Sequence, residues 1–254
     1  MNFAALPERL AHVRAEIARR QAGAGWTHPV TLVAVTKGFG LDAVEAALAA
    51  GLGELGENRV QEALAKIDTP IGRRATWHLI GHLQRNKAKF VPGRFALVQS
   101  LDSAALADEL ARRAAAAGAP LRVLLQVNVA GEAQKSGCAP AGAAALARHV
   151  AGLPELALAG LMTIAPFTDD RAVQQRTFRE LRALRDALQQ EEGLWLPTLS
   201  MGMSADYAVA VEEGATVIRL GTALFGPRAT EPELRTEATK GTGAGEAGPA
   251  AGTA

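Results

Sequence analysis

The fold is decided by a short apolar run that ends in a charged residue, Val30-Thr31-Leu32-Val33-Ala34-Val35-Thr36-Lys37-Gly38. The length of the run and its β-branched content predict a buried strand. Lys37 stands where that strand ends, so its amine is expected at the mouth of a buried sheet. The same position also fits an ordinary solvated lysine at the start of a loop.

Lys37 has a chemistry that most basic residues of this chain lack. Only six of the 27 basic residues are lysines, so an amine here is not the default cation of the composition. An amine can lose its proton and attack a carbonyl, whereas an arginine keeps its charge. Because burial lowers the pKa of a lysine, this position suits a residue that forms a Schiff base.

Short apolar runs recur along the chain and alternate with segments of helical periodicity. A leading helix is predicted at 7–21. Strands are predicted at 30–36, 52–55, 76–81, 95–99, 121–129, 156–161, 196–200 and 216–220. Helices are predicted between and after them at 41–50, 58–68, 84–90, 103–117, 140–151, 169–191 and 204–213.

The alternation predicts an α/β fold, a single (β/α)8 TIM barrel over residues 1–228. Runs that are apolar throughout, such as 121–129, are typical of strands buried on both faces of a parallel sheet. An open doubly wound sheet is the alternative, but no glycine-rich dinucleotide loop follows the first strand. Residues 229–254 contain almost no large apolar side chain, which predicts a disordered C-terminal tail.

The composition is that of a globular protein, with 48% hydrophobic and 21% charged residues over 254 positions. A net charge of +1 with scattered basic residues argues against a nucleic-acid or membrane-surface partner. Cys138 is the single cysteine, which excludes an intrachain disulfide and favours a reducing compartment. Without an apolar export signal in residues 1–21, the expected location is cytoplasmic.

Two loops near the end of the barrel suit a phosphate group. Ser200-Met201-Gly202-Met203-Ser204 follows the seventh predicted strand, and Gly221-Thr222 begins the loop after the eighth. Barrels commonly bind phosphate at these two places through backbone N–H groups. Ser204 is also a candidate cap for the next helix, and Met201 and Met203 are also candidates for core packing.

An amine and a phosphate site together suggest a phosphorylated carbonyl compound held as a Schiff base. Pyridoxal 5′-phosphate is one such compound, and the substrate of a sugar-phosphate aldolase is another. Arg219, on the eighth strand, can only donate hydrogen bonds, so facing a pyridine nitrogen it would leave that nitrogen unprotonated. A salt-bridged arginine that closes the barrel is the other interpretation of Arg219.

A set of ordered motifs carries a family resemblance over nearly all of residues 1–228. The motifs include Val33-Ala34-Val35-Thr36-Lys37, Gly56-Glu57-Asn58-Arg59-Val60-Gln61-Glu62, Trp77-His78-Leu79-Ile80-Gly81-His82-Leu83-Gln84-Arg85-Asn86-Lys87, Gln126-Val127-Asn128, Lys135-Ser136-Gly137, Gly160-Leu161-Met162-Thr163-Ile164, Leu199-Ser200-Met201-Gly202-Met203-Ser204 and Ile218-Arg219-Leu220-Gly221-Thr222-Ala223-Leu224-Phe225-Gly226. Together they resemble the pyridoxal phosphate homeostasis protein family.

The resemblance implies an alanine racemase-like barrel that binds pyridoxal 5′-phosphate as a Schiff base and buffers or delivers it, affecting amino-acid and keto-acid metabolism. Apo-enzymes that depend on this cofactor are the implied acceptors, and a monomer or weak dimer is expected. The residues expected to bind the cofactor are Lys37, Asn58, Ser200, Met201, Arg219, Gly221 and Thr222.

Catalysis is not expected to be robust. Racemisation needs an acid or base on each face of the substrate, and in alanine racemases the second is a tyrosine on a following β-domain. The only tyrosine here, Tyr207, falls within a predicted helix. A weak racemase-like activity on amino acids is the alternative function. No metal site is expected from His78 and His82, whose spacing lacks the helical H-E-x-x-H pattern, and Cys138 is expected to be unreactive.

Overall fold

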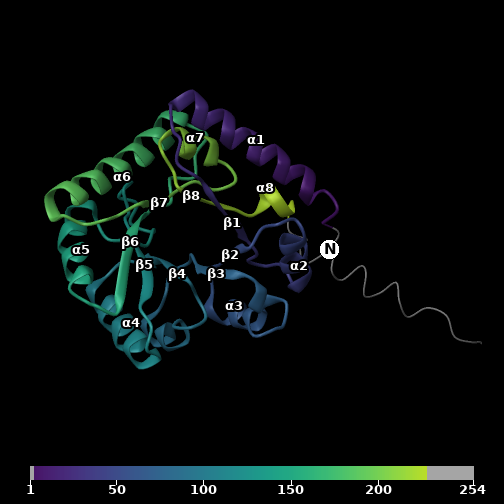
Figure 1. The fold of residues 1–254 in the computed structure, drawn as a ribbon. Helices are drawn as coiled ribbons and strands as arrows, with labels where there is room; N and C mark the ends of the chain where they lie inside the picture. Colours follow the sequence, from purple (N-terminus) through teal and green to yellow (C-terminus); the bar gives the residue numbers. More distant parts are fainter. Residues whose placement is uncertain (1–2, 228–254) are drawn as a thin grey trace, which may run out of the picture.

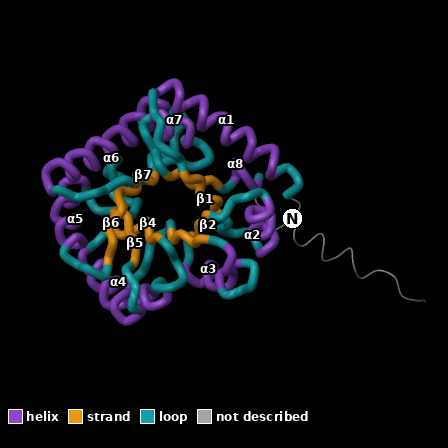
Figure 2. The backbone as a smooth tube through the Cα atoms, viewed as in Figure 1, coloured by secondary structure: helices purple, strands orange, loops and turns teal. Residues whose placement is uncertain are grey.

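The computed structural model describes residues 3–227, which form a closed parallel barrel of eight strands in sequence order. Figure 2 shows the strands as a ring with the helices outside it. The strands are β1 (Thr31–Val35), β2 (Glu54–Glu57), β3 (Thr76–Leu79), β4 (Leu97–Leu101), β5 (Leu121–Gln126), β6 (Leu156–Met162), β7 (Thr198–Ser200) and β8 (Val217–Leu220).

The helices cover the outside of the barrel (Figure 1). They are α1 (Leu6–Ala24), α2 (Leu41–Ala49), α3 (Val60–Ile67), α4 (Ala104–Ala117), α5 (Ala143–Ala151), α6 (Arg171–Glu192), α7 (Tyr207–Glu212) and α8 (Thr222–Phe225). Three 3-10 turns complete the set: η1 (Gly72–Arg74), η2 (Arg85–Phe90) and η3 (Pro140–Gly142).

The predicted barrel and leading helix are confirmed, and the differences are local. Residues 85–90 form a 3-10 turn where an α-helix was predicted, and the predicted helix at 140–151 begins with the separate turn η3. The short helix α8 was not predicted. The predicted tail at 229–254 and the end of the predicted barrel domain at residue 228 lie outside the described residues.

The apolar core has two parts on the two faces of the sheet. Alternate strand residues such as Val98, Leu125 and Leu161 belong to the large cluster shared with the helices. Leu97, Leu124 and Met162, each next to one of these residues, form a separate small cluster with Ala159. Period-two alternation places these three side chains inside the barrel. Much of the remaining interior is polar, and the functional site lies above it.

Helix α1 packs across the place where the barrel closes. Its residues Leu6, Leu10, Val13 and Ile17 are buried and share one helical face. The helix contacts α7 and α8, the last two helices of the described part of the chain (Figure 1). The two ends of the described chain are therefore packed against each other.

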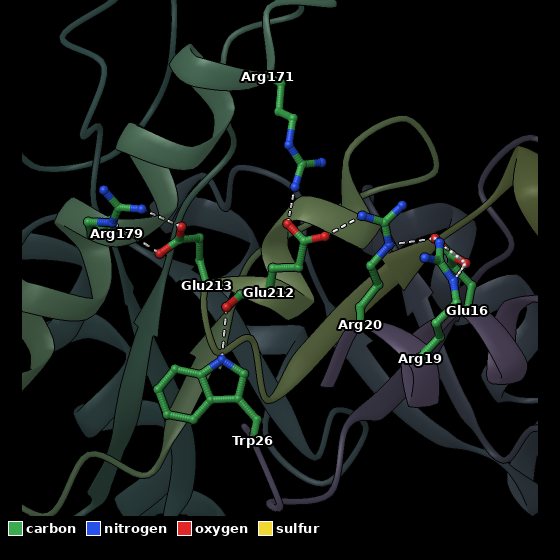
Figure 3. Close-up of polar contacts among 8 residues, drawn as sticks. All are labelled: Glu16, Arg19, Arg20, Trp26, Arg171, Arg179, Glu212 and Glu213. Atoms are coloured by element: carbon green, nitrogen blue, oxygen red, sulfur yellow. Dashed lines mark hydrogen bonds and ion pairs between the residues drawn. The ribbon is translucent and has the colours of Figure 1, made fainter. Parts of the chain in front are cut away.

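Ion pairs join α1 and α6 to the end of α7 on the surface (Figure 3). The carboxylate of Glu212 accepts hydrogen bonds from both Arg20 and Arg171. The backbone carbonyl of Glu212 accepts a 2.8 Å hydrogen bond from the indole Nε1 of Trp26. Beside it, Arg179 Nη2 lies 2.8 Å from Glu213 Oε1. These contacts hold α1, α6 and α7 together on the outside of the barrel.

No helix within residues 3–227 is both long and apolar enough to cross a bilayer.

The tight packing of β6 against β7 gives a test of the fold. Gly160 has a φ of +151°, and a Cβ atom there would lie 1.9 Å from the carbonyl oxygen of Thr198. We expect Gly160→Ala to lower the free energy of unfolding by about 2 kcal/mol or more, because the strands must separate. Urea denaturation followed by circular dichroism measures this change.

Gly23→Ala is the matched control, because a Cβ there meets no atom within 4 Å. A helical glycine replaced by alanine is expected to gain about 0.5–1 kcal/mol. Equal stability of the two variants would contradict the strand packing described here.

Candidate functional site

A cavity of about 440 Å³ opens at the carboxyl ends of the strands. This is the end at which (β/α)8 barrels carry their functional groups. The structure places five of the seven predicted site residues in its lining: Lys37, Asn58, Arg219, Gly221 and Thr222. The other two, Ser200 and Met201, do not line it.

The lining combines positive charge with flat apolar surface. Lys37, Lys135 and Arg219 supply the cations, and among the described residues no aspartate or glutamate lines the cavity. The apolar part is formed by Val35, Phe39, Ile80, Ile164 and Phe167. Such a cavity suits a ligand with a planar ring and an anionic group.

Barrel closure brings Lys37 and Arg219 onto neighbouring strands. β1 pairs with β8 in parallel, with Val33 opposite Arg219 and Ala34 opposite Leu220. Lys37 follows the carboxyl end of β1, and Gly38 donates its backbone N–H to Glu62 Oε1 at 2.5 Å. The predicted amine and the predicted guanidinium therefore serve one cavity although 182 positions separate them.

Arg219 is a buried charge held by neutral acceptors. Only 4% of the residue is exposed. Its Nη1 donates to Ser200 Oγ at 2.6 Å and its Nη2 to the carbonyl oxygen of Thr163 at 2.9 Å. Burial lowers the pKa of this guanidinium to about 10, against the favourable charge of Asp206. Arg219 is therefore still a cation and a donor near neutral pH.

Ser200 and Met201 have structural contacts in place of the predicted ones. The Ser200 hydroxyl is fully buried between Arg219 and Gln99, so it supports the arginine and does not face the cavity. Met201 is also fully buried, its side chain lies in the large apolar core, and its N–H donates to Val217 at 3.1 Å. The sequence places this loop at the carboxyl end of the barrel but does not show that these two side chains turn away from the cavity.

Ser204 joins the two loops that were predicted to hold a phosphate. Its Oγ accepts hydrogen bonds from the backbone N–H groups of Gly221 at 3.3 Å and Ala223 at 3.1 Å. The expected capping role is wrong, because α7 begins after Asp206, whose carboxylate accepts the N–H of Met203 at 2.5 Å. Burial raises the pKa of Asp206. Ser204 instead lines the cavity beside Gly221 and Thr222.

A buried ion pair supports the backbone next to Lys37. Lys66 Nζ lies 2.5 Å from Glu57 Oε1 and donates to the carbonyl oxygen of Thr36 at 2.8 Å. Thr36 Oγ1 donates to the same carboxylate oxygen at 2.6 Å. Burial raises the pKa of Glu57, and hydrogen bonds from Lys66 and Thr36 oppose this effect. The pair ties β1, β2 and α3 together directly below the cavity.

The two histidines and the cysteine considered in the sequence lie in different environments. His78 is buried inside the barrel, whereas His82 lines the cavity and lies 3.4 Å from Asp102. Burial raises the pKa of the Cys138 thiol to about 11, which agrees with an unreactive cysteine. Gln99 was missed by the sequence analysis. The signal for it was a large polar side chain at an inward position of β4, among Leu97, Val98 and Leu101.

Comparisons with known proteins agree on one class. A family model described as "Alanine racemase, N-terminal domain" matches residues 9–229. The chain is 46% identical to the pyridoxal phosphate homeostasis protein of Pseudomonas aeruginosa, over 88% of this chain and 96% of that protein. It is 42% identical to the protein of the same name from Aquifex aeolicus, over 87% of this chain and 97% of the relative.

A solved structure of PipY from Synechococcus elongatus PCC7942, described "with PLP bound", is also similar. The TM-score is 0.76 at 40% identity, covering 87% of this chain and 100% of that one. The fold and the site thus define a barrel of the alanine racemase N-terminal-domain class. Within that class, the chain belongs to the pyridoxal phosphate homeostasis protein family.

The buried ion pair of Lys66 and Glu57 gives a prediction about the stability of the strands next to the site. Lys66→Met removes the cation and leaves the carboxylate of Glu57 buried with only the hydroxyl of Thr36 as a donor. Breaking a buried pair on one side costs about 3–5 kcal/mol. We expect a loss of that size in the free energy of unfolding, measured by urea denaturation.

Lys89→Met is the control, because Lys89 is exposed and lies over the ring of Phe90. A surface change of this kind is expected to stay within about 0.5 kcal/mol. A Lys66 variant as stable as the Lys89 variant would show that the ion pair does not support β1.

Proposed function

We propose that this chain binds pyridoxal 5′-phosphate as a Schiff base with Lys37 and acts in homeostasis of the cofactor, by buffering or delivering it. The observation that carries the proposal is that Lys37, Arg219 and the Gly221-Thr222 loop line the same cavity. The PipY relative described "with PLP bound" supports the same ligand. Through the cofactor, the protein would affect amino-acid and keto-acid metabolism.

The residues of the cavity fit the groups of this cofactor one by one. The amine of Lys37 suits the aldehyde, and the guanidinium of Arg219 suits the ring nitrogen. The backbone of Gly221 and Thr222, with the hydroxyl of Ser204 beside them, suits the phosphate. Asn58 is assigned to the ring region of the cofactor.

Arg219 argues against transamination. When bound, the cofactor supplies an electron-withdrawing ring, and this withdrawal is strongest when the ring nitrogen carries a proton. A guanidinium that stays protonated offers that nitrogen a hydrogen bond but no proton. An unprotonated ring nitrogen withdraws electrons more weakly, which disfavours transamination and agrees with a protein that stores or transfers the cofactor.

A weak racemase-like activity is the second candidate function, favoured by the alanine racemase class of the barrel. Against it stands the position of Tyr207, the only tyrosine in the sequence, which lies on α7 outside the lining of the cavity. A second acid or base on the opposite face of a substrate would have to come from another residue. We therefore favour a protein without robust catalysis.

Acceptors and location also belong to the proposal. Apo-enzymes that depend on pyridoxal 5′-phosphate are the partners that delivery would require. The cytoplasm is the proposed location, in line with the single cysteine of the sequence. We propose a monomer or weak dimer as the state in which the cofactor is held.

The attachment point is tested with Lys37→Ala. We expect the purified wild-type protein to show the visible absorption band of a Schiff base with the cofactor, and the variant to lose it. Borohydride reduction followed by peptide mass mapping is expected to place the cofactor on Lys37. Lys135→Ala is the control, because this second lysine lines the same cavity.

Cofactor trapped on Lys135 in place of Lys37 would overturn the assignment. Borohydride trapping of a sugar phosphate without added cofactor would instead indicate a Schiff-base aldolase.

The absence of robust catalysis is tested by turnover. Protein loaded with pyridoxal 5′-phosphate is incubated with L-alanine, and D-alanine is measured by chiral chromatography. We expect a rate per cofactor within about tenfold of free pyridoxal phosphate, because the tyrosine that serves as the second acid or base in alanine racemases has no counterpart among the described residues that line the cavity. A rate a thousandfold above free cofactor would establish the racemase alternative.

A further inference from the structure

The interior of this barrel holds a line of polar side chains. Most (β/α)8 barrels fill this space with layers of valine, isoleucine and leucine. Here the inward positions of β2, β3, β4, β7 and β8 carry polar or charged residues in hydrogen-bonded contact. They are Glu54, His78, Gln99, Ser200 and Arg219.

Each member of this polar line contacts the next at short distance. Arg219 Nη1 lies 2.6 Å from Ser200 Oγ, and that hydroxyl lies 2.6 Å from Gln99 Oε1. Gln99 Nε2 lies 2.8 Å from His78 Nδ1. His78 Nε2 lies 2.6 Å from Glu54 Oε2, which completes the line.

The two ends fix the direction of every hydrogen bond between them. Arg219 can only donate, so Ser200 accepts from it and gives its own proton to Gln99 Oε1. The amide nitrogen of Gln99 then faces His78 Nδ1, which must accept. His78 therefore carries its proton on Nε2 and donates it to the carboxylate of Glu54.

The polar line also spans the length of the barrel. Arg219 lines the cavity at the carboxyl ends of the strands, whereas Glu54 is the first residue of β2 and borders a second cavity at the opposite end. The side chain of Glu54 is 39% exposed, while Gln99 and Ser200 are fully buried. A cation at one end and a carboxylate at the other polarise the three neutral groups in the same direction.

Simple burial of Arg219 does not require so long a line. Ser200 and the carbonyl oxygen of Thr163 already accept from the guanidinium. Apolar side chains at positions 78 and 99 would avoid the free-energy cost of burying an imidazole and an amide. What these two residues add is a fixed orientation for Ser200, and through it for the guanidinium.

We propose that His78 and Gln99 are positioning residues, which hold Arg219 through Ser200 in the orientation that meets the ring nitrogen of the cofactor. The inference rests on the proposed function. Neither residue lines the cavity, so neither touches the cofactor itself. Gln99 accepts a hydrogen bond from the Ser200 hydroxyl and so keeps that hydroxyl from turning away, and His78 holds Gln99 in place.

The test compares Gln99→Met with Ser100→Ala. Gln99→Met keeps the volume but removes both hydrogen bonds, so we expect affinity for pyridoxal 5′-phosphate to fall about tenfold and the visible absorption band to shift. Ser100 lies on the same strand, is fully buried and makes no side-chain hydrogen bond, so its variant should bind as wild type does. Spectrophotometric titration at one pH measures both quantities.

A second measurement needs no cofactor and no variant. In the apo wild-type protein, ¹⁵N NMR of labelled histidine is expected to show His78 protonated on Nε2 and unprotonated on Nδ1. A proton on Nδ1 would overturn the inference, because the order of hydrogen bonds would then be broken at Gln99.

The positioning role of the polar line and the proposed function can be wrong independently of each other. If wild type attaches the cofactor to Lys37 but Gln99→Met and Ser100→Ala bind it equally, positioning by the polar line is wrong and the proposed function stands. If wild type attaches no cofactor, the proposed function is wrong. Should Gln99→Met not fold, His78→Phe provides the same comparison, because phenylalanine removes both hydrogen bonds of His78, and a wild-type band and affinity in that variant would overturn the inference.

Discussion

The pairing of β1 with β8 is the contact on which the rest of this molecule depends. It turns eight parallel strands into a closed wall, so that no strand is left with unpaired backbone groups on one side. It also gives α1 a surface formed by the end of the chain, against α7 and α8. The site exists only after this closure, because its amine and its guanidinium come from the two strands that meet there.

Closure leaves a narrow interior, and in this chain much of that interior holds polar side chains. A cation buried inside a barrel is unfavourable unless nearby acceptors replace water. Arg219 obtains these acceptors from a hydroxyl and a backbone carbonyl, with no carboxylate in contact. The consequence is a guanidinium that is firmly held yet not neutralised, which leaves its charge available to a ligand in the cavity.

The sequence predicts the strands well because each is a compact apolar run between helical segments. It also predicts the location of Lys37, Gly221 and Thr222 at the cavity, since residues directly after a strand must lie at the carboxyl end of a parallel barrel. It fails within the Ser200-to-Ser204 loop, where Met201 turns into the core and Ser204 bridges to the next loop. Which way a residue points there depends on how β7 and β8 pack, and no local pattern records that.

Gln99 shows the second reason for incomplete prediction. Its partners lie on β3 and β7, at other places in the sequence, so the residues around Gln99 do not indicate what its side chain contacts. The buried pair of Lys66 and Glu57 is similar, because nothing in the sequence indicates that a helical lysine crosses to the carbonyl of Thr36. Both sets of contacts can be recognised only when the register between strands is known.

Closure by the first and last strands also determines when the protein can be completed during synthesis. Until residues 217–220 have left the ribosome, β1 has one bare edge and the apolar face of α1 has no α7 or α8 to cover it. Before that point the chain exposes an unpaired strand edge and the apolar face of α1. The ligand-binding cavity cannot form earlier, because Lys37 follows β1 and Arg219 lies on β8.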